Sequence, residues 1–154
     1  MEIKNTLGVK GRIDFKIVHK DGTSESWTVN NLITSAGKAQ LALLAGDASA
    51  TPFTYLAVGT STTAVAIGQT ALVAEISTNG LSRAAATVSR TTTTVTNDTL
   101  VLYKAFTVTG SSTVEEVGVF NASSVGTMLG RALTTSKIVV NGDELQVTYN
   151  IIFS

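Results

Sequence analysis

The chain has 154 residues, the length of one compact domain that can bury a substantial core. Its eleven basic and eleven acidic residues cancel, and charged residues make up only 14% of the chain, so it lacks the field that would gather nucleic acid or an anionic membrane. There is no cysteine, which excludes disulfides, thiolate metal sites and a cysteine nucleophile. We therefore expect a single domain over residues 1–154 that is stabilised by packing or assembly.

Residues 1–10 carry three charged side chains and no long apolar stretch, so we expect neither a signal peptide nor a membrane anchor. Residues 11–30 are predicted to form an N-terminal hairpin. Apolar and charged residues alternate from residue 12 to residue 17, which is typical of a strand with one buried face. Asp21-Gly22 then supplies the turn, and Trp27 and Val29 share one face of the return strand.

One short helix is predicted, over residues 35–45. Three leucines stand among alanines in this segment, Thr34 or Ser35 can cap its N-terminus, and Gly46 can end it. Gly37 weakens the helix by up to about 1 kcal/mol relative to alanine, so we expect the helix to lean on a sheet.

Residues 53–154 are predicted to form the body of a β-sandwich. Threonine, valine and glycine are abundant, which suits pleated strands joined by tight turns. The residue pattern predicts strands at 53–58, 72–76, 81–96, 99–109, 114–120, 127–133, 138–140 and 145–153. The last two form a hairpin around Asn141-Gly142, and the threonine run after Arg90 leads into an exposed turn at Asn97-Asp98. The fold class is therefore all-β, an antiparallel sandwich or a jelly-roll or Greek-key barrel.

Candidate catalytic groups are few. His19 is the sole histidine and lies near the predicted hairpin tip, where an exposed turn residue is the more common role. Glu115 and Glu116 are adjacent, so on a strand their carboxylates face opposite sides and cannot act as an acid pair. One of them is expected to face the core or an interface, paired with an arginine or bound to backbone groups. We expect no catalytic residue.

Ligand-binding motifs are equally sparse. Asp143-Glu144 lacks the repeated acidic loop of a calcium site, and Gly59-Thr60-Ser61-Thr62-Thr63 lacks the lysine and second glycine of a phosphate loop. Trp27, Tyr55, Tyr103 and Tyr149 occupy strand positions without a basic stripe, which indicates packing in the core or at its rim. We expect no metal, no cofactor and no small-molecule substrate.

An ordered series of short motifs carries the functional argument. It runs from Asn30-Asn31-Leu32-Ile33 through Tyr55-Leu56-Ala57-Val58-Gly59-Thr60 and Thr70-Ala71-Leu72-Val73-Ala74-Glu75-Ile76 to Arg83-Ala84, and ends with Glu116-Val117-Gly118-Val119-Phe120-Asn121-Ala122 and Gly130-Arg131-Ala132. Over residues 25–135 this series resembles small structural proteins of tailed bacteriophages, and it is similar to the N-terminal modules of tail-collar fibre proteins. Fibre proteins usually continue into a long shaft, whereas this sequence stops at Ser154. A free-standing module of this size resembles a capsid decoration, or cement, protein.

The resemblance implies a non-enzymatic virion protein, made in the cytoplasm of a bacterial host and assembled into the particle. The first interpretation is a decoration protein that stabilises the head lattice. Its expected partners are the major capsid protein and further copies of itself, with which it would form a homotrimer. The alternative is a tail, collar or fibre-base component. Glu75, Arg83, Glu116 and Arg131 are the residues that the motifs nominate as structural ion pairs or interface groups. Low charge agrees with assembly, since little charge must be desolvated at an interface.

Two further hypotheses come from other classes of protein. A carbohydrate-binding β-sandwich module would use exposed aromatic rings, with Trp27 and Tyr55 as the residues to test. A hydrolase would have to rely on Glu75, Glu115 or Glu116, because no other acid and base combination stands out in the sequence.

Overall fold

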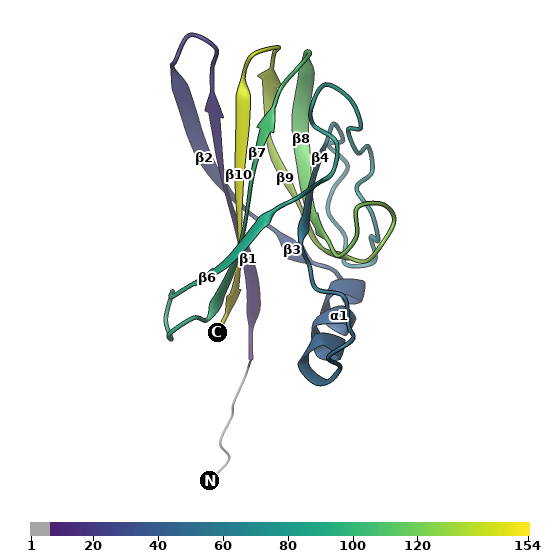
Figure 1. Cartoon of the computed structure of the whole chain (residues 1–154). Coiled ribbons are helices and arrows are strands. Elements are labelled where there is room, and N and C mark those ends of the chain that lie inside the picture. Colours follow the sequence, from purple (N-terminus) through teal and green to yellow (C-terminus); the bar gives the residue numbers. More distant parts are fainter. Residues whose placement is uncertain (1–6) are drawn as a thin grey trace.

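The computed structural model describes residues 7–154 as two five-stranded antiparallel sheets and one helix (Figure 1). Residues 1–6, which belong to the segment expected to lack a signal peptide, lie outside the described residues. The first sheet has the strand order β2 (Ser24–Asn30), β1 (Val9–Val18), β10 (Glu144–Phe153), β7 (Thr99–Thr107) and β6 (Thr87–Thr91). The second has the order β3 (Leu32–Ile33), β9 (Met128–Val139), β8 (Ser112–Phe120), β4 (Tyr55–Gly59) and β5 (Ala84–Ala85). The predicted all-β sandwich is confirmed.

The core lies between the two sheets and follows from the alternation in β1 and β10. These strands pair along their whole length, with Phe15 opposite Val147 and Ile17 opposite Leu145. Every second side chain points inward because the strand repeat is two residues. The same register puts the N-terminal hairpin inside the sandwich, since β1 lies between β2 and β10 and is not set apart from residues 53–154.

The hairpin of residues 11–30 has the predicted turn. Backbone hydrogen bonds join His19 to Thr23 and Gly22 to His19, and Gly22 adopts a φ of 88°. That left-handed conformation favours glycine and explains why Asp21-Gly22 marks the turn.

Helix α1 (Ser35–Gly46) matches the predicted segment to within one residue. The Thr34 side chain accepts a hydrogen bond from the Gly37 backbone N–H at 2.9 Å and so caps the helix. Gly37 is the buried residue of the helix, and a Cβ there would overlap the carbonyl group of Leu129 on β9. The glycine that weakens the helix in isolation therefore allows its close approach to the second sheet.

Three strand predictions were wrong in detail. Residues 72–76 form no strand beyond a single bridge between Gly59 and Glu75, and only 84–85 and 87–91 are strands within 81–96. This segment is nevertheless packed onto the core, because Leu72, Ile76 and Leu81 are buried. Their spacing therefore reflects the burial of an irregular segment and not a strand. Strand β9 runs unbroken to Val139, because β8 extends to Ser112 and pairs with that end.

Candidate functional site

A buried ion pair lies at the centre of the second sheet. The Arg131 Nε on β9 donates to Glu116 Oε2 on the neighbouring strand β8 at 2.6 Å. The two side chains are 1% and 0% exposed. A buried pair of this kind avoids a large desolvation penalty only when further hydrogen bonds satisfy its remaining atoms.

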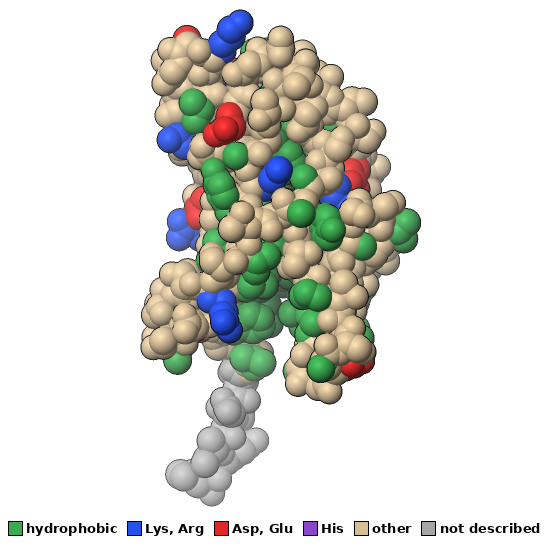
Figure 2. Space-filling view, in the orientation of Figure 1, with side chains coloured by type: hydrophobic (Ala, Val, Ile, Leu, Met, Phe, Trp, Pro, Cys, Tyr) green, Lys and Arg blue, Asp and Glu red, His purple; other side chains and the backbone are tan. Residues whose placement is uncertain are grey.

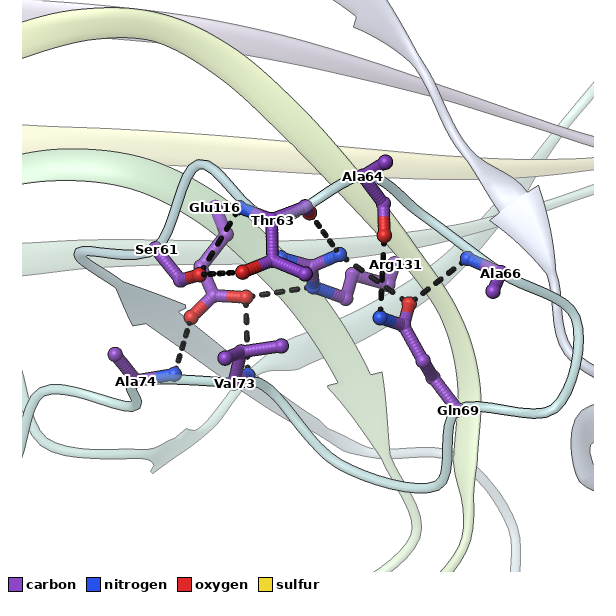
Figure 3. A network of polar contacts seen from close by, with 9 residues as sticks. All are labelled: Ser61, Thr63, Ala64, Ala66, Gln69, Val73, Ala74, Glu116 and Arg131. Atoms are coloured by element: carbon purple, nitrogen blue, oxygen red, sulfur yellow. Dashed lines mark hydrogen bonds and ion pairs between the residues drawn. The ribbon is translucent and has the colours of Figure 1, made fainter.

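Further bonds to all of the pair except Arg131 Nη2, which has no hydrogen-bond partner among residues 7–154, come from the loop that follows β4 (Figure 3). Glu116 accepts from the backbone N–H groups of Val73 at 3.2 Å and Ala74 at 2.7 Å. Arg131 Nη1 donates to the carbonyl of Thr63 at 2.8 Å and to the side chain of Gln69 at 3.2 Å. The ion pair therefore fixes both halves of the loop over residues 60–75 and gives an otherwise irregular segment one conformation.

Gly59 is where this loop leaves β4. A Cβ at this position would overlap the Glu116 carboxylate and the carbonyl group of Ala74. Only glycine lets the strand end approach the carboxylate this closely. This accounts for the glycine of the Ala57-Val58-Gly59 motif.

A second ion pair holds the neighbouring loop. The Arg83 guanidinium forms a bidentate pair with Glu75 at 2.9 and 2.6 Å. It also donates to the carbonyls of Ala122 at 3.2 Å and Val125 at 2.7 Å, and it lies 3.5 Å from the centre of the Phe120 ring. One arginine thus joins three segments through planar hydrogen bonding and a cation–π contact.

The motifs that are spread along the sequence meet in this region. The structure brings Glu75 to Arg83 and Glu116 to Arg131, and it pairs β4 with β8 so that Gly59 lies opposite Glu116. Glu116 is buried, whereas its neighbour Glu115 is half-buried on the other face of β8. The role that this geometry gives the four nominated residues is to hold loops in place.

A polar cluster lies between the β1–β2 turn and the β9–β10 turn. His19 Nδ1 lies 3.4 Å from Asp143 Oδ2, and His19 Nε2 lies 3.6 Å from Glu25 Oε1. Burial works against ionisation of Asp143, but hydrogen bonds from the Val140 and Lys20 N–H groups and from His19 outweigh it and lower its pKa. A hydrogen bond from Lys137, the largest influence, lowers the pKa of Glu25. His19 therefore ties the β1–β2 turn to the β9–β10 turn.

The aromatic residues nominated for sugar binding are packed. Trp27 stacks on Phe15 with ring centres 5.0 Å apart, and its Nε1 donates to Thr134 Oγ1 at 2.5 Å. Tyr55 packs against a small buried cluster that contains Leu72 and Phe120. Tyr149 is fully buried, which raises the pKa of its hydroxyl, and Asn31 donates a hydrogen bond to that hydroxyl. Trp27 and Tyr55 are thus both half-buried, and Phe15 covers one face of the Trp27 ring.

An apolar groove, here called the α1 groove, separates helix α1 from the ends of β1, β7 and β10. It has a volume of about 550 Å³ and is lined by Leu7, Val9, Leu41, Ala42, Leu44, Ala45, Leu100 and Phe153. Leu7 is 78% exposed. Figure 2 shows hydrophobic side chains in the recess between the two lower lobes of the molecule. Apolar surface that is contiguous and recessed marks an interaction site more often than scattered apolar residues do.

The sequence reasoning did not identify this groove. The composition of helix α1 could have indicated it, because Lys38 is the sole charged residue of the helix and apolar side chains surround its axis. A helix of that kind needs cover on more than one side. The roles of Thr63 and Gln69 were also missed, because a backbone carbonyl and an amide in a loop leave no sequence pattern.

Within residues 7–154, no cluster of three or more His, Asp or Glu side chains has the arrangement of a metal site. Within the same residues, no helix combines the length and hydrophobicity that a membrane span requires.

Comparison with known proteins gives one family. The family model described as podophage GP4 fiber I protein gp80 matches residues 32–152, which is most of the chain. The matched region includes both ion pairs, helix α1 and the loops that the pairs hold. No curated protein and no solved structure matches. The chain therefore belongs to the family of the podophage GP4 fiber I protein gp80 and is a bacteriophage structural protein.

Proposed function

We propose that this protein is a non-enzymatic part of a phage fibre and that it assembles through the α1 groove with further copies of itself. The groove is the observation that carries the proposal. Its lining is made of apolar side chains, six of which are leucine, valine or phenylalanine, and all six stay partly or fully exposed to water in the isolated chain. Burying them against a neighbour would gain about 25 cal/mol for each Å² of apolar surface removed from water.

The charge distribution supports assembly at this place. The groove lining contains no ionisable side chain, so a partner would desolvate no charge on this side of the contact. The interface core of stable assemblies is similarly depleted in charged residues. A trimer is the assembly that we propose, in line with the phage structural proteins that the sequence resembles.

Capsid decoration is the second candidate. The same groove and the same low charge suit a protein that packs against the major capsid protein on the head. The family description favours the fibre, because it names a fiber protein. Both candidates place the chain in the virion and assign it no catalytic step.

Copy number in purified virions distinguishes them. Quantitative mass spectrometry would compare this protein with the major capsid protein, and gold-labelled antibody would locate it on the particle. We expect a small fixed number per virion, with label at the tail. A ratio near one to one with label on the shell would establish decoration instead, and absence from washed virions would contradict both candidates.

A further inference from the structure

The outer face of the first sheet, which points away from the core, presents uncharged and charged polar groups around a single aromatic ring. The register places Thr28, Asp14, Thr148, Tyr103 and Thr87 side by side across all five strands. The next row on one side contains Ser26, Lys16, Gln146 and Ala105. Directly opposed residues of this kind have Cβ atoms about 4.5–5.5 Å apart, so their side chains form one continuous surface.

This surface is hollowed. A depression of about 360 Å³ lies over β2, β1 and β10 and is lined by the outward side chains of Asp14, Lys16, Ser26, Thr28, Gln146 and Thr148 together with parts of Phe15 and Trp27. The volume lies within the range of roughly 300–1,000 Å³ that small-ligand sites occupy. Tyr103 stands at its border, because it is the register partner of Thr148, and it is 39% exposed.

Hydrogen bonds fix the position of the Asp14 carboxylate within the depression. Its Oδ1 accepts from Arg12 Nη2 at 2.8 Å and from Thr28 Oγ1 at 2.7 Å, and its Oδ2 accepts from Asn150 Nδ2 at 3.0 Å. Three neighbours thus fix one carboxylate in place. The lining of the depression holds one carboxylate, Asp14, and one ammonium group, Lys16, so it has no net charge that would select an ion.

We propose that this face binds a neutral oligosaccharide, with Tyr103 stacking on one sugar ring and Asp14, Gln146 and Thr148 hydrogen-bonding its hydroxyls. The chemistry on the surface matches both parts of a pyranose. An aromatic ring suits the apolar C–H face of the sugar, and carboxylate, amide and hydroxyl groups on rigid strands suit its ring of hydroxyls. This site is separate from the α1 groove and does not depend on the fibre assignment.

The test is binding of the full chain to an array that carries neutral and acidic bacterial oligosaccharides, followed by titration calorimetry with each sugar retained. We expect neutral sugars to bind and Tyr103→Ala to weaken binding by about tenfold. Tyr103→Phe should retain most of the affinity, because the ring face is kept. Thr148→Ala and Gln146→Ala should each weaken it, whereas Leu43→Ala, on the exposed side of α1, should leave it unchanged.

Three outcomes would overturn the proposal. They are no binding to any neutral sugar on the array, binding that survives Tyr103→Ala, and binding confined to acidic sugars that disappears when salt is raised. Thermal unfolding of each variant would show that it is folded, and a Tyr103→Ala protein that unfolds would be replaced by the Gln146→Ala and Thr148→Ala pair for the decision.

Discussion

Arg131 shows how much one residue contributes when its charge is buried. It reaches Glu116, Thr63 and Gln69 at once, and replacing it removes the cation while the carboxylate of Glu116 stays inside. We expect Arg131→Met to lower the free energy of unfolding by about 3–5 kcal/mol. Chemical denaturation would measure this change.

The matched control is Arg12, whose exposed pair with Asp14 has a similar length of 2.8 Å. Arg12→Met should change the free energy of unfolding by no more than about 1 kcal/mol, because water screens an exposed pair. Equal effects of the two substitutions would show that burial does not determine the contribution of Arg131.

Asp98 gives a prediction for the dependence of stability on pH. Hydrogen bonds from the backbone N–H groups of Val95, Thr93 and Thr94 to its carboxylate lower its pKa from the ordinary value of 3.8 to about 2. A carboxyl group with a lowered pKa stabilises the folded state fully above its unfolded pKa. That stabilisation is lost as the pH falls from about 4 to about 2.

Comparison of the wild type with Asp98→Asn isolates this effect from those of the other carboxylates. The difference in melting temperature between the two proteins should be constant above pH 4 or so and should shrink as the pH falls toward the lowered pKa. A difference that stays the same across that range would mean that the turn does not depend on the ionised carboxylate.

At the scale of elements, helix α1 owes its position to Gly37. A methyl group there would overlap the Leu129 carbonyl, so the helix or β9 would have to move. We expect Gly37→Ala to destabilise the protein, although alanine is the better helix former by about 1 kcal/mol. Gly46, at the other end of the same helix, has open space at its Cβ position, so Gly46→Ala should be neutral or stabilising. Thermal unfolding would give the melting temperatures of both variants and the wild type. Stabilisation by both substitutions would exclude close packing as the role of Gly37.

The same elements show what the sequence could predict. Strands β1 and β10 and the hairpin turn at Asp21-Gly22 were predictable because strict alternation and a turn glycine are local signals. The segment 72–81 was not, because buried apolar residues in a loop have the spacing of a short strand. The four charged residues were nominated by their motifs, but their pairing depends on how β4, β8 and β9 lie together. The groove depends on the placement of α1 against three strand ends, which no local pattern records.

At the scale of the whole molecule, assembly through the α1 groove predicts that a charge inside it blocks association. Ala42 lines the groove and is exposed in the isolated chain, so Ala42→Glu leaves the fold intact while placing a carboxylate where the partner would pack. Burying that unpaired charge is costly, and we expect association to weaken at least about tenfold.

Ala39→Glu is the matched control, because Ala39 is exposed on the same helix and does not line the groove. Light scattering after size-exclusion chromatography would give the oligomeric state of both variants, and thermal unfolding would show that both are folded. Because the two substitutions add the same charge to the same helix, a loss of association in Ala42→Glu alone points to the groove and away from the net charge. A wild-type chain that stays monomeric at all concentrations, or an Ala42→Glu protein that assembles like Ala39→Glu, would contradict assembly through this surface.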